Sequence, residues 1–239
     1  MKVKKSKSMK RIGLIGAMDE EIKEFIKHSK NVEENKWHEF TFFTAELFGK
    51  DVVIMRTGFG KVFAAMMCQK LIDTYELASI IFTGVAGSIN PELKIGDIVI
   101  GKDCMQHDLD AEELGFSRGA IPLTSYKIFV TDKKLRNLAL KVRVYKKKVK
   151  EGTILTGDQF ITKNKLKRYS YLIDELKGDA IEMEGASIAH VCTINKIPFL
   201  IVRTISDKAD ENAVHDFSKF LPIVAKNSFK IVKGIFENM

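Results

Sequence analysis

The stretch Ser79-Ile-Ile-Phe-Thr-Gly-Val-Ala-Gly-Ser88 contains the clearest fold signal in this chain of 239 residues. Its first half is a continuous apolar run, which is typical of a strand in a sheet that is covered on both faces. Its second half is rich in glycine and permits close approach of the backbone to a ligand, although an ordinary tight turn has the same composition. We therefore expect a buried strand that leads into a loop.

Strands and helices alternate on both sides of this stretch. The other expected strands cover residues 11–16, 39–47, 51–56, 97–101, 152–155 and 198–203. The expected helices cover residues 19–30, 61–75, 132–144 and 184–195, and a long C-terminal helix carries one apolar stripe from Phe217 to Ile235. This alternation predicts an α/β fold with a parallel or mixed sheet, in which ligands bind beyond the carboxyl ends of the strands.

Length and composition favour one globular domain, residues 11–239, preceded by a basic flexible tail, residues 1–10. No apolar run reaches the roughly 18 residues that a membrane helix needs, and the tail lacks the features of a secretory signal. The three cysteines are widely spaced, which argues against a disulfide framework or a zinc site and favours a reducing compartment. We therefore expect a cytoplasmic protein without a metal site.

The net charge of +8 is concentrated in three basic segments: the tail, residues 141–150 and residues 163–168. Such segments bind polyanions in some proteins and are solvated faces in more of them. No aromatic residues are interleaved with them in a nucleic-acid-binding pattern, so we expect no nucleic-acid partner. A surface that binds sulfated glycans through the lysines stays open as an alternative.

Acidic residues follow three of the expected apolar segments. Asp19-Glu20-Glu21 follows the first strand, Glu182 and Glu184 lie on either side of Met183, and Asp207 follows Val202-Arg203-Thr204-Ile205-Ser206. Each group alone is explained by acids in the first turn of a helix, worth about 0.3–1 kcal/mol each, or by a capping residue. Three such groups together favour acid/base chemistry on a small polar substrate, because charge at buried strand ends is costly unless it is used.

Two glycine motifs argue against a nucleotide cofactor. Gly58-Phe-Gly-Lys61 opens a helix but lacks the full spacing of a phosphate loop, and Gly13-Leu-Ile-Gly16 lacks the spacing of a dinucleotide site. The five histidines show no metal-ligand spacing.

The order of motifs along the chain resembles that of the bacterial 5′-methylthioadenosine/S-adenosylhomocysteine nucleosidases. The motifs are Ile15-Gly-Ala-Met-Asp-Glu-Glu21, Thr57-Gly-Phe-Gly-Lys61, Thr83-Gly-Val-Ala-Gly87, Gly157-Asp-Gln-Phe-Ile161, Glu182-Met-Glu184 and Arg203-Thr-Ile-Ser-Asp207. The resemblance implies a three-layer α/β/α nucleoside phosphorylase-like fold with a central mixed sheet, a homodimer and no cofactor. It implies adenine nucleosides as substrates, whose N-glycosidic bond is hydrolysed to release adenine.

The resemblance also implies the catalytic roles. Asp207, positioned by Ser206, would donate a proton to N7 of adenine. Glu21 would hold and deprotonate the attacking water, with Arg203 nearby to orient it. An aspartate that stays protonated near neutral pH needs a raised pKa, and the apolar strand before Asp207 supplies the desolvation.

Substrate-binding roles follow from the same resemblance. Glu184 would bind the ribose hydroxyls, Met183 would pack under the sugar, Phe160 would stack on adenine, and the Ile161 backbone would bind the adenine edge. Met18, Phe59 and Phe217 would border the ribose and the 5′-thio group. The remaining residues of this predicted site are Val85, Ala86, Gly87 and Glu182. Val85 offers no hydroxyl to the water, which must find its partners elsewhere.

A further segment matches the loop that completes the 5′ pocket of the neighbouring subunit. Its residues are His107, Leu114, Phe116 and Pro122, and Leu114 and Phe116 replace an aromatic pair that is often found there. Substrates with other 5′ groups, such as 5′-deoxyadenosine or aminodeoxyfutalosine, therefore stay open. A purine nucleoside phosphorylase on the same fold is the main alternative reaction, but the carboxylates after the first strand would repel phosphate.

Overall fold

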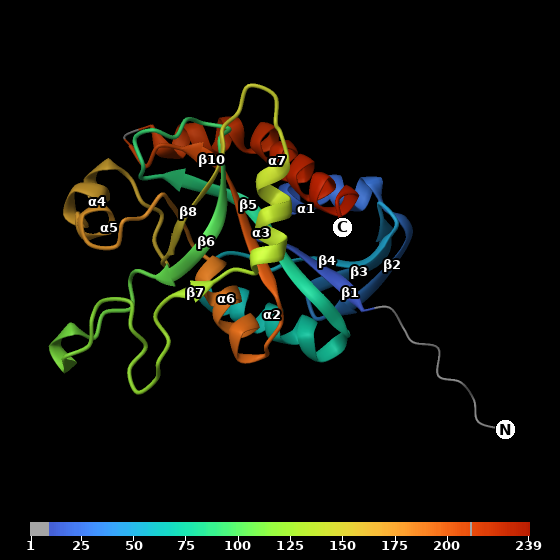
Figure 1. Ribbon diagram of the computed structural model, residues 1–239, viewed down its shortest axis with the longest axis horizontal. Coiled ribbons are helices and arrows are strands. Elements are labelled where there is room, and N and C mark those ends of the chain that lie inside the picture. Colours follow the sequence, from blue (N-terminus) through green and yellow to red (C-terminus); the bar gives the residue numbers. More distant parts are fainter. Residues whose placement is uncertain (1–9, 211) are drawn as a thin grey trace.

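The computed structural model describes residues 10–210 and 212–239 (Figure 1). Its strands are β1 (Arg11–Gly16), β2 (Lys30–Trp37), β3 (Phe40–Leu47), β4 (Lys50–Arg56), β5 (Leu77–Ser88), β6 (Ile98–Gln106), β7 (Phe129–Val130), β8 (Val149–Thr156), β9 (Ala180–Glu182) and β10 (Phe199–Asp207). Its α-helices are α1 (Asp19–His28), α2 (Lys61–Thr74), α3 (Lys133–Lys141), α4 (Lys163–Arg168), α5 (Tyr171–Asp174), α6 (Gly185–Ile194) and α7 (Ala213–Glu237). All but Lys10 of the expected basic tail lies outside the described residues.

Helices cover both faces of the sheet, and this confirms the three-layer α/β/α fold (Figure 1). The apolar residues of α2 and α6 pack on one face, and those of α1, α3 and α7 pack on the other. Successive residues of β5 alternate between the two cores: Ile80 and Phe82 join the first, and Ile81 joins the second. An uninterrupted apolar strand results because both of its faces are buried.

The central sheet is mixed, with the strand order β10-β6-β8-β9-β5-β1-β4-β3-β2 and with β7 paired to β6. The strands β1, β5 and β10 are parallel, and their carboxyl ends lie together. Because β10 pairs with both β5 and β6, the pairings β5-β10-β6-β8-β9-β5 form a closed ring. Within this ring β9 runs antiparallel to β5, so Glu182 reaches the site from the opposite direction.

The glycine-rich second half of the opening stretch is not a loop. The strand β5 continues to Ser88 because it has a partner strand on each side: β10 pairs with it from Ile80 to Gly87, and β9 pairs with Gly87 and Ser88. The expectation of a loop or turn over residues 83–88 was therefore wrong. The strand β10 likewise extends to Asp207, beyond the expected end at residue 203.

Three strands escaped prediction altogether, and one of them, β7, has only two residues. The strand β2 is polar and exposed along nearly all of its length, so it shows no alternation of apolar and polar residues. It forms by pairing with β3 at the edge of the sheet. The strand β9 has only three residues, which is too short for any periodicity. Among the described residues, no helix is both long and apolar enough to span a membrane.

Candidate active site

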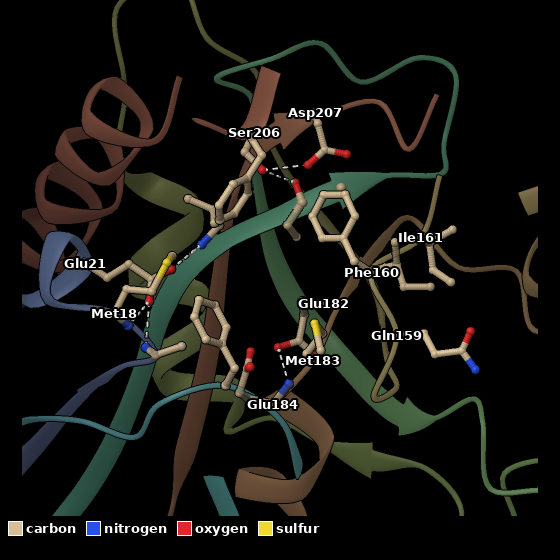
Figure 2. A pocket seen from close by; sticks show the side chains of 17 residues that line it. Met18, Glu21, Gln159, Phe160, Ile161, Glu182, Met183, Glu184, Ser206 and Asp207 are labelled. Carbon is tan, nitrogen blue, oxygen red and sulfur yellow. Dashed lines mark hydrogen bonds between the residues drawn. The ribbon is translucent and has the colours of Figure 1, made fainter. Parts of the chain in front are cut away.

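A pocket lies where β1, β5 and β10 end (Figure 2). The residues that line it are Ala17, Met18, Glu21, Phe59, Val85, Ala86, Gly87, Gln159, Phe160, Ile161, Ile181, Glu182, Met183, Glu184, Ser206, Asp207 and Phe217. Segments that are far apart in the sequence therefore meet at one cavity.

Glu21 lies in the first turn of α1 and is buried. Its Oε2 accepts hydrogen bonds from the backbone N–H of Ala17 at 2.6 Å and of Met18 at 3.1 Å, and its Oε1 accepts one from Val85 N–H at 2.9 Å. Burial raises the pKa of Glu21, while Arg203 and these three N–H groups oppose the rise. A Cβ on Gly84 would overlap the carboxylate, so glycine is required for this close approach.

Asp207 is the last residue of β10 and is 1% exposed. Its Oδ2 accepts a hydrogen bond from Ser206 Oγ at 2.9 Å, and its Oδ1 accepts one from Ala209 N–H at 2.9 Å. Burial raises the pKa of Asp207 above its usual range, which favours a protonated carboxyl group. On the neighbouring strand, a Cβ on Gly87 would lie 2.9 Å from Oδ1, so a side chain there would push against the carboxyl group.

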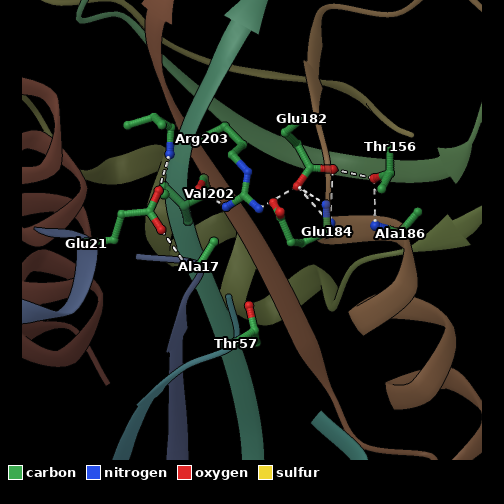
Figure 3. Close-up of polar contacts among 12 residues, drawn as sticks. Ala17, Glu21, Thr57, Thr156, Glu182, Glu184, Ala186, Val202 and Arg203 are labelled. Atoms are coloured by element: carbon green, nitrogen blue, oxygen red, sulfur yellow. Dashed lines mark hydrogen bonds and ion pairs between the residues drawn. The ribbon is translucent and has the colours of Figure 1, made fainter. Parts of the chain in front are cut away.

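Glu182 is held from several directions (Figure 3). Its Oε2 lies 2.6 Å from Nη2 of Arg203 and accepts hydrogen bonds from the N–H groups of Glu184 and Gly185 at 3.1 and 2.7 Å. Its Oε1 accepts a hydrogen bond from the hydroxyl of Thr156. With so many partners, the Glu182 carboxylate is fixed in one orientation at the end of β9.

Glu184 lies directly before α6, and its side chain is buried. Its Oε1 accepts a hydrogen bond from the backbone N–H of Gly60 at 2.8 Å. Burial raises the pKa of Glu184 to about 8; Glu182 and Glu21 add to the rise, and Gly60 and Arg203 oppose it. The pocket therefore holds a carboxyl group that changes charge in the physiological pH range.

The pocket brings together every predicted catalytic and substrate-binding residue except Arg203. Arg203 is 1% exposed and lies behind the wall, with its guanidinium over the ring of Phe82 at 3.9 Å and paired with Glu182. Sequence reasoning missed Ala17, Gln159 and Ile181. Ala17 and Gln159 lie inside two of the motifs, and Ile181 directly precedes a third. Their place in or beside these motifs was the signal that could have identified them.

The four residues predicted for a partner's pocket do not line this one. His107 is buried and lies 3.2 Å, through Nδ1, from the hydroxyl of Tyr171. Leu114 is 74% exposed, and Phe116 and Pro122 are half-buried. They lie in the long segment between β6 and β7, which projects from the body of the molecule (Figure 1).

Several lysines of residues 141–150 have partners within the chain. Lys147 Nζ donates to the carbonyl of Ile95 at 2.9 Å, Lys148 Nζ lies 3.3 Å from Glu92, and Lys150 Nζ lies 2.8 Å from Asp179. These contacts account for part of the basic segment without a polyanion. Among the described residues, no group of three or more His, Cys, Asp or Glu side chains is arranged to hold a metal ion.

Comparison with known proteins identifies the class. The family model described as "Phosphorylase superfamily" matches residues 11–237. The 5′-methylthioadenosine/S-adenosylhomocysteine nucleosidase of Actinobacillus succinogenes is 36% identical over 235 residues, which are 96% of this chain and 99% of the relative. The aminodeoxyfutalosine nucleosidase of Campylobacter jejuni is also 36% identical, over 233 residues, which are 97% of this chain and 100% of the relative.

Solved structures agree with these matches. The 5′-methylthioadenosine/S-adenosylhomocysteine nucleosidase of Neisseria meningitidis, in complex with methylthio-immucillin-A, superposes with a TM-score of 0.91 at 33% identity. The match covers 97% of this chain and all of that one. The chain therefore belongs to the 5′-methylthioadenosine/S-adenosylhomocysteine nucleosidase family, within the phosphorylase superfamily. Nucleosidases are N-glycosyl hydrolases.

Proposed function

We propose that this enzyme hydrolyses the N-glycosidic bond of 5′-methylthioadenosine and S-adenosylhomocysteine, releasing adenine and the 5-thio-substituted ribose. The observation that carries the proposal is that Glu21 and Asp207, two buried carboxyl groups with raised pKa values, border the same pocket. One is suited to protonate the leaving base, and the other to deprotonate a water.

Asp207 acts as the general acid in this proposal. Adenine leaves poorly as an anion and well once N7 is protonated. Burial raises the pKa of Asp207, which favours the protonated form, and the hydrogen bonds from Ser206 and Ala209 fix the orientation of its carboxyl group. As the C1′–N9 bond breaks, the proton passes to N7 and the carboxylate is left behind.

Glu21 acts as the general base. It must be ionised to take a proton from water, and the three backbone N–H groups together with nearby Arg203 stabilise the ionised form against the effect of burial. Its carboxylate also lies at the pocket wall, where negative charge stabilises the positive charge that develops on the sugar. The water oxygen then bonds to C1′, and the proton goes to Glu21.

The sugar and base are bound between these two groups. We assign the ribose hydroxyls to Glu184 and the underside of the sugar to Met183, both of which line the pocket. Phe160 stacks on adenine, and its ring meets that of Phe217 edge to face with centroids 5.8 Å apart. Met18, Phe59 and Phe217 border the ribose and the 5′ group.

We propose that the working enzyme is a homodimer in the cytoplasm. Two segments expose large apolar side chains, which is a feature of interaction surfaces: α2, with Val62 at 79% exposed, and the segment between β6 and β7, with Leu114 and Leu123 at 74% and 95%. The same segment carries the residues predicted to complete a partner's pocket. Light scattering at several concentrations tests the dimer.

The three cysteines are free and buried, which suits a reducing compartment such as the cytoplasm.

The direct test is to incubate the protein with 5′-methylthioadenosine, with and without phosphate, and to measure free adenine. Equal release in both conditions supports hydrolysis. Release that needs phosphate, together with a ribose 1-phosphate product, would show that the reaction is phosphorolysis.

Aminodeoxyfutalosine is a second candidate substrate. The relative from Campylobacter jejuni that bears this name is as similar to the chain as the methylthioadenosine nucleosidase from Actinobacillus succinogenes. The two substrates share the adenine and ribose parts, so the same catalytic groups serve both. Measuring kcat/KM for both substrates, with 5′-deoxyadenosine as a third, decides which 5′ group the enzyme prefers.

A further inference from the structure

The motif Gly58-Phe-Gly-Lys61 leads into the start of α2, where anion-binding loops are found in other proteins. In this chain its backbone N–H groups bind carboxylate side chains of the protein itself. Backbone N–H groups at the start of a helix attract negative charge. At the start of α2, Gly60 N–H donates to Glu184 Oε1 and Lys61 N–H donates to Asp158 Oδ1, both at 2.8 Å. The start of α2 is thereby attached to two sides of the pocket.

The side chain of Lys61 extends this attachment. Its Nζ lies 2.6 Å from Asp108 Oδ1 and 3.9 Å from Asp158 Oδ2. Asp158 N–H in turn donates to Asp108 Oδ2 at 2.9 Å. The side chains of Lys61 and Asp108 are only 19% and 22% exposed, so the contact is more sheltered than an ordinary surface ion pair.

Lys61 and Asp158 belong to segments that line the pocket, whereas Asp108 belongs to a segment that does not. Asp158 precedes Phe160 and Ile161 in the loop after β8, and Phe59 precedes Lys61. Asp108 begins the long segment between β6 and β7. Lys61 itself does not line the pocket.

Glycine at position 60 makes the close contact feasible. Its φ of +89° lies in the region that side-chain-bearing residues avoid, and a Cβ there would lie 3.1 Å from Asp158 Oδ1. The backbone of α2 therefore approaches the loop after β8 as closely as the hydrogen bonds require.

We propose that Lys61 is a positioning residue, which holds the loop of Phe160 and Ile161 against the start of α2 and so sets the affinity for the adenine part of the substrate. This inference rests on the proposed function. It assigns Lys61 no contact with the substrate. Without the lysine charge, the carboxylates of Asp108 and Asp158 would repel each other and the loop would move away from α2.

The test compares K61M with the double variant K61M/D108N and with a control, K70M, which removes a lysine from the same helix outside the pocket. The measurements are kcat and KM for 5′-methylthioadenosine and the calorimetric Kd for adenine. We expect K61M to raise KM and the adenine Kd about tenfold, with a smaller change in kcat, because a displaced binding loop weakens binding first. The double variant should recover much of the loss, since it removes the repulsion, and K70M should match the wild type.

Hydrogen exchange of residues 157–161 provides a readout that does not depend on activity. Faster exchange there in K61M, and not in K70M, supports the inference. It is overturned if KM, Kd and exchange are unchanged in K61M, or if K61M/D108N is as impaired as K61M. If the wild type releases no adenine, the proposed function fails, and the exchange comparison still decides the role of Lys61.

Discussion

Nη2 of Arg203 lies 2.6 Å from Oε2 of Glu182, and the two side chains are 1% and 3% exposed. The charge of Arg203 also opposes the rise that burial causes in the pKa values of Glu21 and Glu184, which lie in different segments of the site. A cation that never reaches the pocket surface therefore helps to set the ionisation of the carboxyl groups that do (Figure 3).

Replacing Arg203 with methionine should destabilise the fold by about 3–5 kcal/mol, because it leaves the carboxylate of Glu182 buried without its cation. Chemical denaturation of the purified variant measures the loss. The double variant R203M/E182Q removes both charges and should regain part of the stability. A single variant as stable as the wild type would contradict the ion pair's role.

Replacing Asp207 with asparagine should slow adenine release by about 10²–10⁴-fold, since the amide cannot transfer a proton to N7. The thermal melting curve should change little because the two side chains have nearly the same shape. Adenine release under single-turnover conditions is the appropriate measurement. Undiminished release would remove Asp207 from the role of general acid.

Replacing Glu21 with glutamine should stop turnover while preserving binding of adenine nucleosides. Glutamine cannot accept the proton from water, but it fills the same space at the pocket wall. The matched control is Glu20→Gln, which changes the exposed neighbour in the same helical turn and should leave the rate unchanged. A normal rate in E21Q would show that another group activates the water.

The affinity for a non-hydrolysable adenine nucleoside analogue should rise with pH through about 8, the raised pKa of Glu184. Below that pH the Glu184 carboxyl group is protonated, so one of its oxygens carries a donor where the ribose hydroxyls need an acceptor. Above that pH the Glu184 carboxylate accepts hydrogen bonds from both ribose hydroxyls. Calorimetric titrations across this range measure the change, and Glu184→Gln should remove it. The same pH dependence in E184Q would assign the titration to another residue.

Much of the fold followed from local patterns. The apolar run of Ile80, Ile81 and Phe82 predicted a doubly covered strand, and the stripe along the C-terminal helix predicted the helix that packs on the sheet. These predictions held because burial imposes a periodicity that the residues themselves display. Where an element is exposed on both sides, as in β2, burial imposes no pattern and prediction had no signal.

For the site, the motifs indicated which residues meet but not how they are arranged. The sequence by itself determined the class of fold, because burial leaves a local pattern of apolar residues, and the family resemblance of its motifs implied nearly all of the residues that line the pocket. Only the tertiary structure decided that Thr83–Ser88 continues as strand, that Arg203 lies behind the pocket wall, and that Lys61 joins Asp108 to Asp158. Those outcomes depend on hydrogen bonds and charges between residues that are far apart in the sequence, and no local pattern encodes such pairings. The separation is 21 residues for Glu182 with Arg203, 47 for Lys61 with Asp108 and 97 for Lys61 with Asp158.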